Sequence, residues 1–287
     1  MMSIVTYQPQ LPWGLTGSVS YTWQRGLHLL RERNINAPFP DISGIRPLVN
    51  RGPVLQFEST GRMTRQALAL SLSRNLTSKI SIAGRYTLSF VHSDTDGPYS
   101  TPANSYDLST EFGRASTDAR HRFNLDLWTT LPGGFDLAPY LSISSGLPFN
   151  ITTGLDNNGD TFFTDRPAFA SPGDPGAIVT PFGVFNPNPR PGDSIIARNY
   201  GQGPGRISAG LYFGKTFSFG RGDQHQTSNP FSSFRGPYSL TLHTDIENLF
   251  NHTNLGPLNG VLTSPFFGRA NQAGTARRIK LTMQLGF

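Results

Sequence analysis

The residues at 156–160, DNNGD, place oxygen-bearing side chains on alternate positions, at Asp156, Asn158 and Asp160. Hard oxygen ligands with this spacing are those that Ca²⁺ prefers, and Asp165 could supply a later oxygen. The chain departs from the EF-hand pattern afterwards, because it lacks the glycine and the glutamate that should follow. Two interpretations therefore stay open: a calcium loop, or an exposed turn rich in Asp and Asn.

Histidine offers weaker candidates for chemistry. His121 lies between Arg120 and Arg122 where a loop enters a strand, and the sequence has no H-x-x-x-H or HExxH spacing. We interpret these three side chains as partners of loop carboxylates. His243, Asp245 and Glu247 share one strand face and could serve acid–base chemistry. Such groups also line the lumen of large barrels, so we predict that the protein is not an enzyme.

The elements that must position these residues are strands, because alternation of apolar and polar residues is the dominant pattern. In 207–219, for example, Ile207, Leu211 and Phe213 alternate with small and polar residues. Most of the predicted strands are long enough for a tilted strand to cross a bilayer. The pattern predicts about eight full strands, at 15–30, 63–76, 79–92, 120–131, 134–146, 207–219, 237–251 and 276–287. Residues 1–10 could be the remnant of one further strand, which would make eight or nine strands. Within 134–146, Pro139 cannot donate to a ladder, so we expect a bulge or an unpaired position there.

The connections between these strands are sorted by length. Tight turns alternate with long links that are rich in Gly, Pro, Asn and Asp. The long links are residues 31–62, 93–119, 147–206 and 252–275. Only 220–236 breaks the alternation, as a longer link on the short-turn side. Antiparallel strands would bring every long loop to one end, as in outer-membrane barrels. The polar faces carry few of the Lys/Glu pairs of a water-facing surface, so we expect the apolar face to meet lipid. Lys215 on that face must then lie near an interface.

Composition agrees with a β-protein and excludes several other classes. The chain has 287 residues, 36% hydrophobic and 15% charged, with no cysteine. Disulfides and thiol chemistry are therefore excluded. The net charge of +6 is carried by arginines scattered singly, so we expect no nucleic-acid partner. No run of apolar residues is long enough for a spanning helix, and the first residues do not form a signal peptide. A soluble β-protein is the remaining alternative.

Four stretches resemble one family. They are SYDLSTEFGRASTDARHRFNLDLWTTLP, LSISSGLPFNITTGLDNNGDTFFTDRPAF, IENLFNHTNLG and RRIKLTMQLGF, which together span about 105–287. They are similar to the C-terminal barrel of TonB-dependent outer-membrane receptors, in particular the Oar-like group that has a carboxypeptidase-regulatory-like domain. The resemblance implies an all-β, antiparallel, up-and-down transmembrane barrel in a Gram-negative outer membrane.

The resemblance also sets expectations for what the chain lacks. Family members have a signal peptide, an N-terminal plug, a TonB-box and about 22 strands. We therefore expect residues 1–287 to be a single barrel segment without plug or signal peptide, part of a larger barrel, with TonB reached only through missing N-terminal parts. The function implied is uptake of an unknown extracellular ligand through a pore wall and external loops. The alternative is a stand-alone small barrel with a structural or adhesion role.

The last strand carries a second set of candidate residues. Five apolar side chains alternate up to the terminal carboxylate, at Ile279, Leu281, Met283, Leu285 and Phe287. In a barrel the last strand must pair with the first to remove the open edge. The resemblance implies that this pattern is the signal read by the barrel-assembly machinery. Partners expected for the chain are therefore outer-membrane lipid, that machinery and the extracellular ligand, and no cofactor is expected beyond the candidate calcium.

Overall fold

The computed structural model describes residues 1–40, 44–220 and 238–287, and its regular secondary structure is almost entirely β-strand. In these ranges no helix is long and apolar enough to cross a membrane. The two helical elements are single 3-10 turns, η1 (Pro12–Gly14) and η2 (Ser109–Glu111). The long strands are β1 (Met2–Tyr7), β2 (Leu15–Asn34), β3 (Leu55–Thr77), β4 (Ile80–Ser93), β6 (His121–Leu131), β7 (Phe135–Ser144), β13 (Arg206–Phe219), β14 (Tyr238–Glu247) and β15 (Arg278–Gly286).

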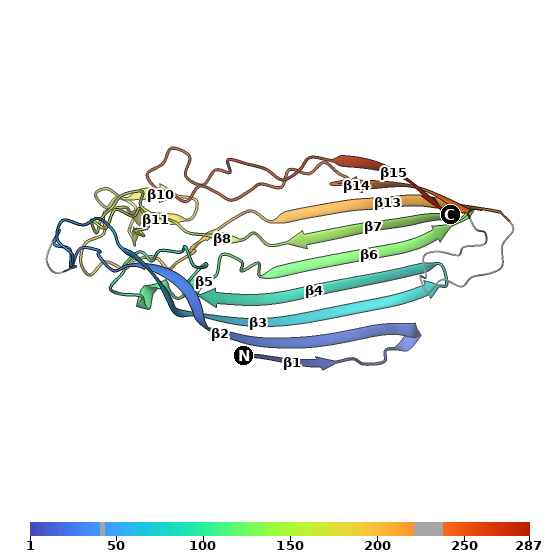
Figure 1. Ribbon diagram of the computed structural model, residues 1–287, viewed down its shortest axis with the longest axis horizontal. Coiled ribbons are helices and arrows are strands. Elements are labelled where there is room, and N and C mark those ends of the chain that lie inside the picture. Colours follow the sequence, from blue (N-terminus) through green and yellow to red (C-terminus); the bar gives the residue numbers. More distant parts are fainter. Residues whose placement is uncertain (41–43, 221–237) are drawn as a thin grey trace.

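These nine strands lie side by side in one antiparallel sheet, in the order β1-β2-β3-β4-β6-β7-β13-β14-β15 (Figure 1). The short β5 (Gly113–Arg114) pairs with β4 beside this row. Figure 1 shows the long loops gathered at one end of the sheet and the tight turns at the other, as the sequence predicts. Most of the exceptional link at 220–236 lies outside the described residues.

The register aligns one apolar and one polar face across the whole sheet. On the apolar face, Leu70 of β3 pairs with Val19 of β2 and Tyr86 of β4. On the polar face, the next residue, Ser71, pairs with Ser18 and Arg85. The pairing continues without a change of face to β15. A slip of one residue anywhere along this path would have exchanged the two faces.

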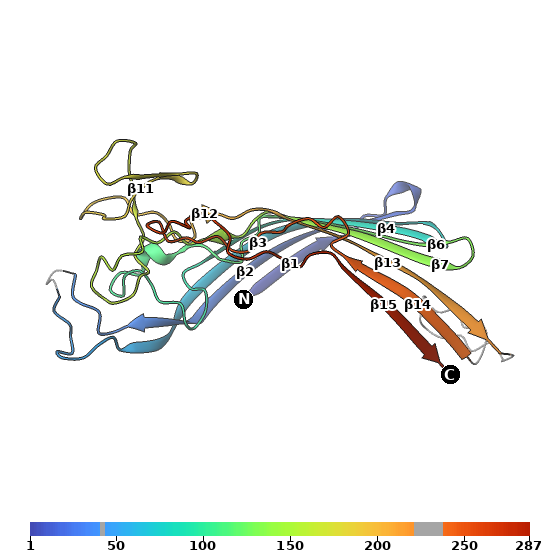
Figure 2. The same ribbon diagram turned by 90° about the horizontal axis from the view of Figure 1, so that it is seen from above.

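The sheet is strongly curved, and Figure 2 shows β14 and β15 turned away from the plane of β4, β6 and β7. In the described residues β1 pairs only with β2, and β15 pairs only with β14. Nine long strands agree with the expected eight or nine, because the first residues form β1, paired with β2 from Met2↔Gln24 to Tyr7↔Val19. Right-handed twist and curvature of this kind are what closing a sheet into a barrel requires.

The prediction that 31–62 is a loop is wrong at both ends. β2 continues to Asn34 and β3 begins at Leu55, so the two strands pair far beyond the rest of the sheet. The pairing shifts register between Gly26 and Leu30, where His28 adopts a left-handed conformation with φ of 58°. This bulge lets the hairpin bend without losing its ladder.

The predicted strand at 237–251 ends earlier than expected, at Glu247. Asn248 and Asn251 both have positive φ, near 50°, a conformation that Asn tolerates better than most residues. The Asn248 side chain then closes the turn, since its Oδ1 accepts from His252 N at 2.9 Å and its Nδ2 donates to Thr275 O at 3.0 Å. Alternation alone could not show this stop, because Leu249 and Phe250 continue the apolar pattern.

Pro139 behaves as expected on one side of its strand. The ladder between β6 and β7 is interrupted between the pairs Asp126↔Tyr140 and Thr129↔Leu137. The register is the same on both sides, so this is an unpaired position and not a bulge. On the other side, Pro139 keeps its place opposite Leu211 of β13.

Candidate functional site

The long loops fold together into one layer over the end of the sheet, which we call the loop cap. It comprises residues 35–54, 94–120, 145–205 and 248–277, of which 41–43 are not described. Two small sheets lie within it: β9 (Ala168–Phe169), β10 (Ile178–Thr180) and β11 (Gly183–Asn186) form one, and β8 (Pro148–Phe149) and β12 (Gly201–Gln202) form the other.

The loop cap has its own hydrophobic core. Ile151, Phe185, Ile196 and Leu262 are almost completely buried against one another. The rings of Phe149, Phe182 and Phe267 pack against this cluster. Phe182 makes T-shaped contacts with Phe149 and with Phe267, at centroid distances of 5.1 and 5.8 Å. Side chains from two different loops therefore share one core, which holds the loops in fixed positions.

Buried ion pairs join the loops further. Arg166 Nη2 lies 2.9 Å from Glu111 Oε1, and Arg31 Nη2 lies 2.6 Å from Asp94 Oδ1, with all four side chains at most 7% exposed. Arg198 also pairs with Asp96, and here only the arginine is buried, since the Asp96 side chain is 31% exposed. Each pair connects two segments that are far apart in the sequence. A charge that is buried in this manner needs its partner, so the pairs fix which loop segments meet.

Asp118 of the D-x-R-H-R-F segment is a completely buried acceptor at the rim of the sheet. Its Oδ1 accepts from Val91 N at 2.9 Å, and its Oδ2 accepts from Arg114 Nε at 2.8 Å and lies 3.5 Å from Arg120 Nε. His121 Nδ1 instead lies 2.7 Å from the Tyr86 hydroxyl. The predicted pairing with a loop carboxylate is confirmed for Arg120, and the histidine serves as a hydrogen-bonding partner of a strand residue.

The candidate calcium residues are near neighbours in the cap. Asp156 accepts from the backbone N of both Asp160 and Thr161, at 3.0 and 2.9 Å. Asn158 Oδ1 also accepts from Asp160 N, and Asp165 Oδ2 accepts from Asn157 N at 2.9 Å. These bonds account for the turn by themselves. In the described ranges no three His, Asp or Glu side chains gather to hold a metal. Calcium binding therefore stays a prediction.

The electrostatics of this turn are unusual. Burial raises the pKa of Asp165 to about 6, against the backbone hydrogen bond from Asn157 and with the charges of Asp160 and Asp156 adding to the rise. Burial likewise raises the pKa of Asp160, and the hydrogen bond from Phe162 N opposes the rise. Burial and the neighbouring carboxylates thus favour the protonated forms of Asp160 and Asp165.

A polar groove of about 440 Å³ opens where the polar face of the sheet meets the cap. Its walls are hydroxyls, amides and one basic and one acidic group, from Tyr140, Ser142, Ser144, Arg206, Ser208, Glu247, Asn248 and Asn254 among others. Sequence reasoning missed this groove. Alternation placed Ser142 and Ser208 on the polar face, but only the register shows that they lie opposite each other.

The strand carboxylates predicted to share the polar face do so. His243 Nε2 lies 3.4 Å from Asp245 Oδ2, and Glu247 accepts from Arg278 of β15 at 2.7 Å. The five candidate assembly residues are largely exposed on the apolar side of β15 or beyond it, with Leu281 78% exposed. Phe287 follows the last strand residue, Gly286. Recognition by an assembly machinery remains a prediction.

Comparisons with known proteins agree with this architecture. A family model described as "Outer membrane beta barrel domain" matches residues 3–280. The fold is similar to the outer membrane transporter YddB from Escherichia coli, with a TM-score of 0.57 and 12% identity over 99% of this chain. The chain spans about a third of that structure, 32% of its length. No curated protein matches the sequence.

Proposed function

Since the chain belongs to the outer membrane β-barrel domain family and is a protein of the outer membrane, we propose that it forms part of the wall of a TonB-dependent uptake receptor. The observation that carries the proposal is the polar groove beneath the loop cap. The interior of a small closed barrel is filled by its own side chains. A wall with a continuous polar face suits a wide, water-filled lumen instead.

In this proposal the two faces of the sheet have separate roles. The apolar face meets lipid, and the polar face lines the pore. The loop cap lies over the external opening, because outer-membrane barrels place long loops outside and short turns in the periplasm. An extracellular ligand meets the cap first and then the groove at Arg206 and Glu247. TonB acts through parts that precede a barrel of this kind, and the coverage of 32% supports a place in a larger barrel.

The test compares two deletions in the bacterium that carries the gene. Growth is measured on glycans, peptides and metal chelates as sole nutrient sources. We expect loss of the receptor gene and loss of TonB to abolish growth on the same nutrient. Growth that fails without the receptor but persists without TonB would contradict the proposal. Reduced surface attachment with unchanged growth would instead identify the adhesion role of a stand-alone barrel.

A point variant connects the test to the groove. Arg206→Ala removes the basic group of the groove and should reduce uptake, with the amount of protein in the outer membrane unchanged. Lys79→Ala, at the tight turn between β3 and β4, is the matched control that removes one exposed cation elsewhere. Equal uptake by the two variants would show that the groove does not contact the ligand.

A further inference from the structure

Lys215 is a cation on the apolar face of the sheet. In β13 it pairs with Phe135 of β7 and with Leu242 of β14, both on the same face. Phe135 is the first residue of β7, immediately after the tight turn that contains Gly133 and Gly134. Lys215 is therefore level with the tight turn between β6 and β7, while β13 and β14 stay paired for four more residues, as far as Phe219↔Tyr238.

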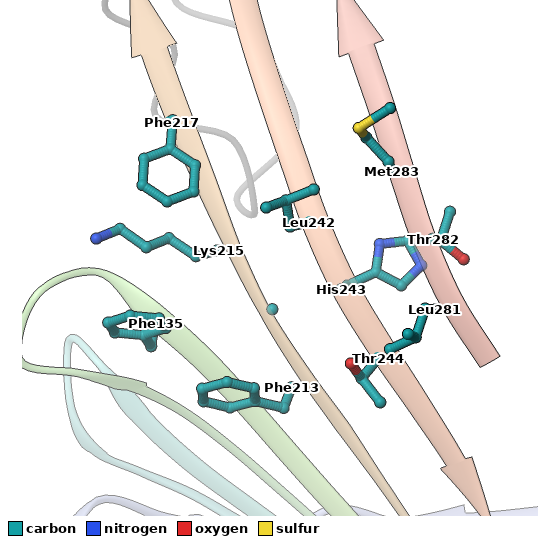
Figure 3. A pocket seen from close by; sticks show the side chains of 11 residues that line it. Phe135, Phe213, Lys215, Phe217, Leu242, His243, Thr244, Leu281, Thr282 and Met283 are labelled. Atoms are coloured by element: carbon teal, nitrogen blue, oxygen red, sulfur yellow. The ribbon is translucent and has the colours of Figure 1, made fainter. Parts of the chain in front are cut away.

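The surroundings of the ammonium group are aromatic. Nζ lies 4.5 Å from the ring centroid of Phe135 and 4.7 Å from that of Phe217, distances typical of cation–π contacts. The Phe135 ring is in turn stacked on Phe213, with centroids 5.4 Å apart. Figure 3 shows the Lys215 side chain extending between Phe217 and Phe135. The rings hold the cation in place on the apolar face.

This cation has no anionic partner in the part of the chain that the structure describes. None of the ion pairs among those residues includes Lys215. Aromatic rings accept no strong hydrogen bond from the three ammonium donors. Lys215 is only half-buried, so its ammonium group is open to an anion from outside the chain.

An apolar groove adjoins the same residues. Its volume is about 430 Å³, and Phe213, Phe217, Leu242, Leu281 and Met283 supply most of its apolar wall (Figure 3). A cation near the tight-turn end of the sheet, beside an apolar groove that spans β13, β14 and β15, matches a molecule with a phosphate and a hydrocarbon chain. We propose that this surface binds an anionic glycerophospholipid, with its phosphate on Lys215 and one acyl chain in the groove.

The inference goes beyond uptake, because it concerns the lipid side of the wall. The experiment places the purified protein in nanodiscs of phosphatidylcholine with a minor fraction of phosphatidylglycerol, and native mass spectrometry counts the lipids that stay bound. We expect the wild-type protein to retain phosphatidylglycerol preferentially. Lys215→Met should lower this preference about fivefold, as expected for one lysine at a membrane surface. Lys215→Arg should keep it, because arginine also pairs with phosphate and with aromatic rings.

Matched controls use the other two lysines. Lys79→Met at a tight turn and Lys280→Met on the polar face remove the same charge and should leave the preference unchanged. Phe135→Leu keeps the charge but removes one ring, and should lower the preference about twofold or more. The proposal is overturned if Lys215→Met binds like the wild type, if Lys280→Met loses as much, or if inorganic phosphate displaces the lipid.

Discussion

The loop cap and the sheet differ in where their stability originates. The cap buries Phe185, Ile151 and several charged side chains almost completely. The long strands contribute only Ala67, Val91 and Ala209 to the buried apolar side chains of the described residues. Large apolar residues on the sheet instead stay exposed, among them Leu72 and Leu281. The apolar side chains of the sheet are left for lipid, whereas the cap buries an apolar core of its own.

The difference separates two kinds of interaction. In the sheet, the ladder satisfies the backbone groups, as it must inside a bilayer, and the surrounding lipid covers the apolar face. In the cap, apolar burial and paired charges offset the entropy of ordering long loops. Substitutions should therefore act locally and differently in the two regions.

The largest effect is expected from the core of the cap. Phe185→Ala leaves a cavity in a fully buried site and should lower the free energy of local unfolding of the cap by about 3–5 kcal/mol. Hydrogen exchange of cap amides in detergent measures this change. Leu72→Ala, on the exposed apolar face of β3, is the control and should leave exchange in the cap unaltered. Faster exchange throughout the sheet in Phe185→Ala would show that the cap and the sheet are not stabilised independently.

A buried and an exposed ion pair provide the second test. Arg166→Met leaves Glu111 buried without its partner and should destabilise the cap by about 3 kcal/mol. Arg278→Met removes a pair in which both side chains are well exposed, so it should destabilise the protein far less than Arg166→Met. The same exchange measurement applies. Equal losses in the two variants would show that burial does not distinguish the cap from the sheet.

The third effect is smaller and depends on pH. Because the pKa of Asp165 rises from 3.8 to about 6 on folding, the folded cap binds a proton more tightly than the unfolded chain. This contribution to stability is complete below pH 3.8 and is lost as pH rises through about 6. Lowering the pH from 7 to 5 should therefore stabilise the region 156–165 by about 1 kcal/mol, which slows its exchange after correction for intrinsic rates.

Two variations sharpen this third test. Asp165→Asn retains an acceptor for Asn157 N but cannot titrate, so the pH dependence should disappear. If the turn binds calcium, added Ca²⁺ should protect the wild-type loop at pH 7 and lose its effect at pH 5, where protons compete with it. A loop that ignores Ca²⁺ at both pH values is the turn of the alternative interpretation.

The smallest effect on stability is expected at the chain end. Phe287 is fully exposed beyond β15, so its deletion should change the free energy of unfolding little. If it is part of an assembly signal, the deletion should still reduce the amount of protein inserted in the outer membrane of living cells. Phe219→Ala, at the exposed end of β13, is the control for loss of one aromatic residue. Normal insertion of the deletion variant would refute the signal.

The sequence predicted most of the sheet because alternation reports on side chains that face lipid or a polar interior. It failed where backbone conformation decides. Asn248 ends β14 through its left-handed φ and its side-chain bonds, against an apolar pattern that continues. The core of the cap was also beyond reach, since Ile151 and Leu262 meet only after two loops fold together. The acidic turn could be located but its pKa shift could not, because burial causes it.

The length of the hairpin formed by β2 and β3 determines how far it extends from the membrane. β3 has 23 residues, and at about 3.3 Å per residue it measures about 76 Å along its axis. At a tilt of about 45° it rises about 50 Å, twice the apolar band of about 25 Å that such barrels present. Its upper half must therefore stand in the external water. The described residues 35–40 and 44–54 lie at the end of this hairpin, so a particle approaching the cell touches them before it is near the bilayer.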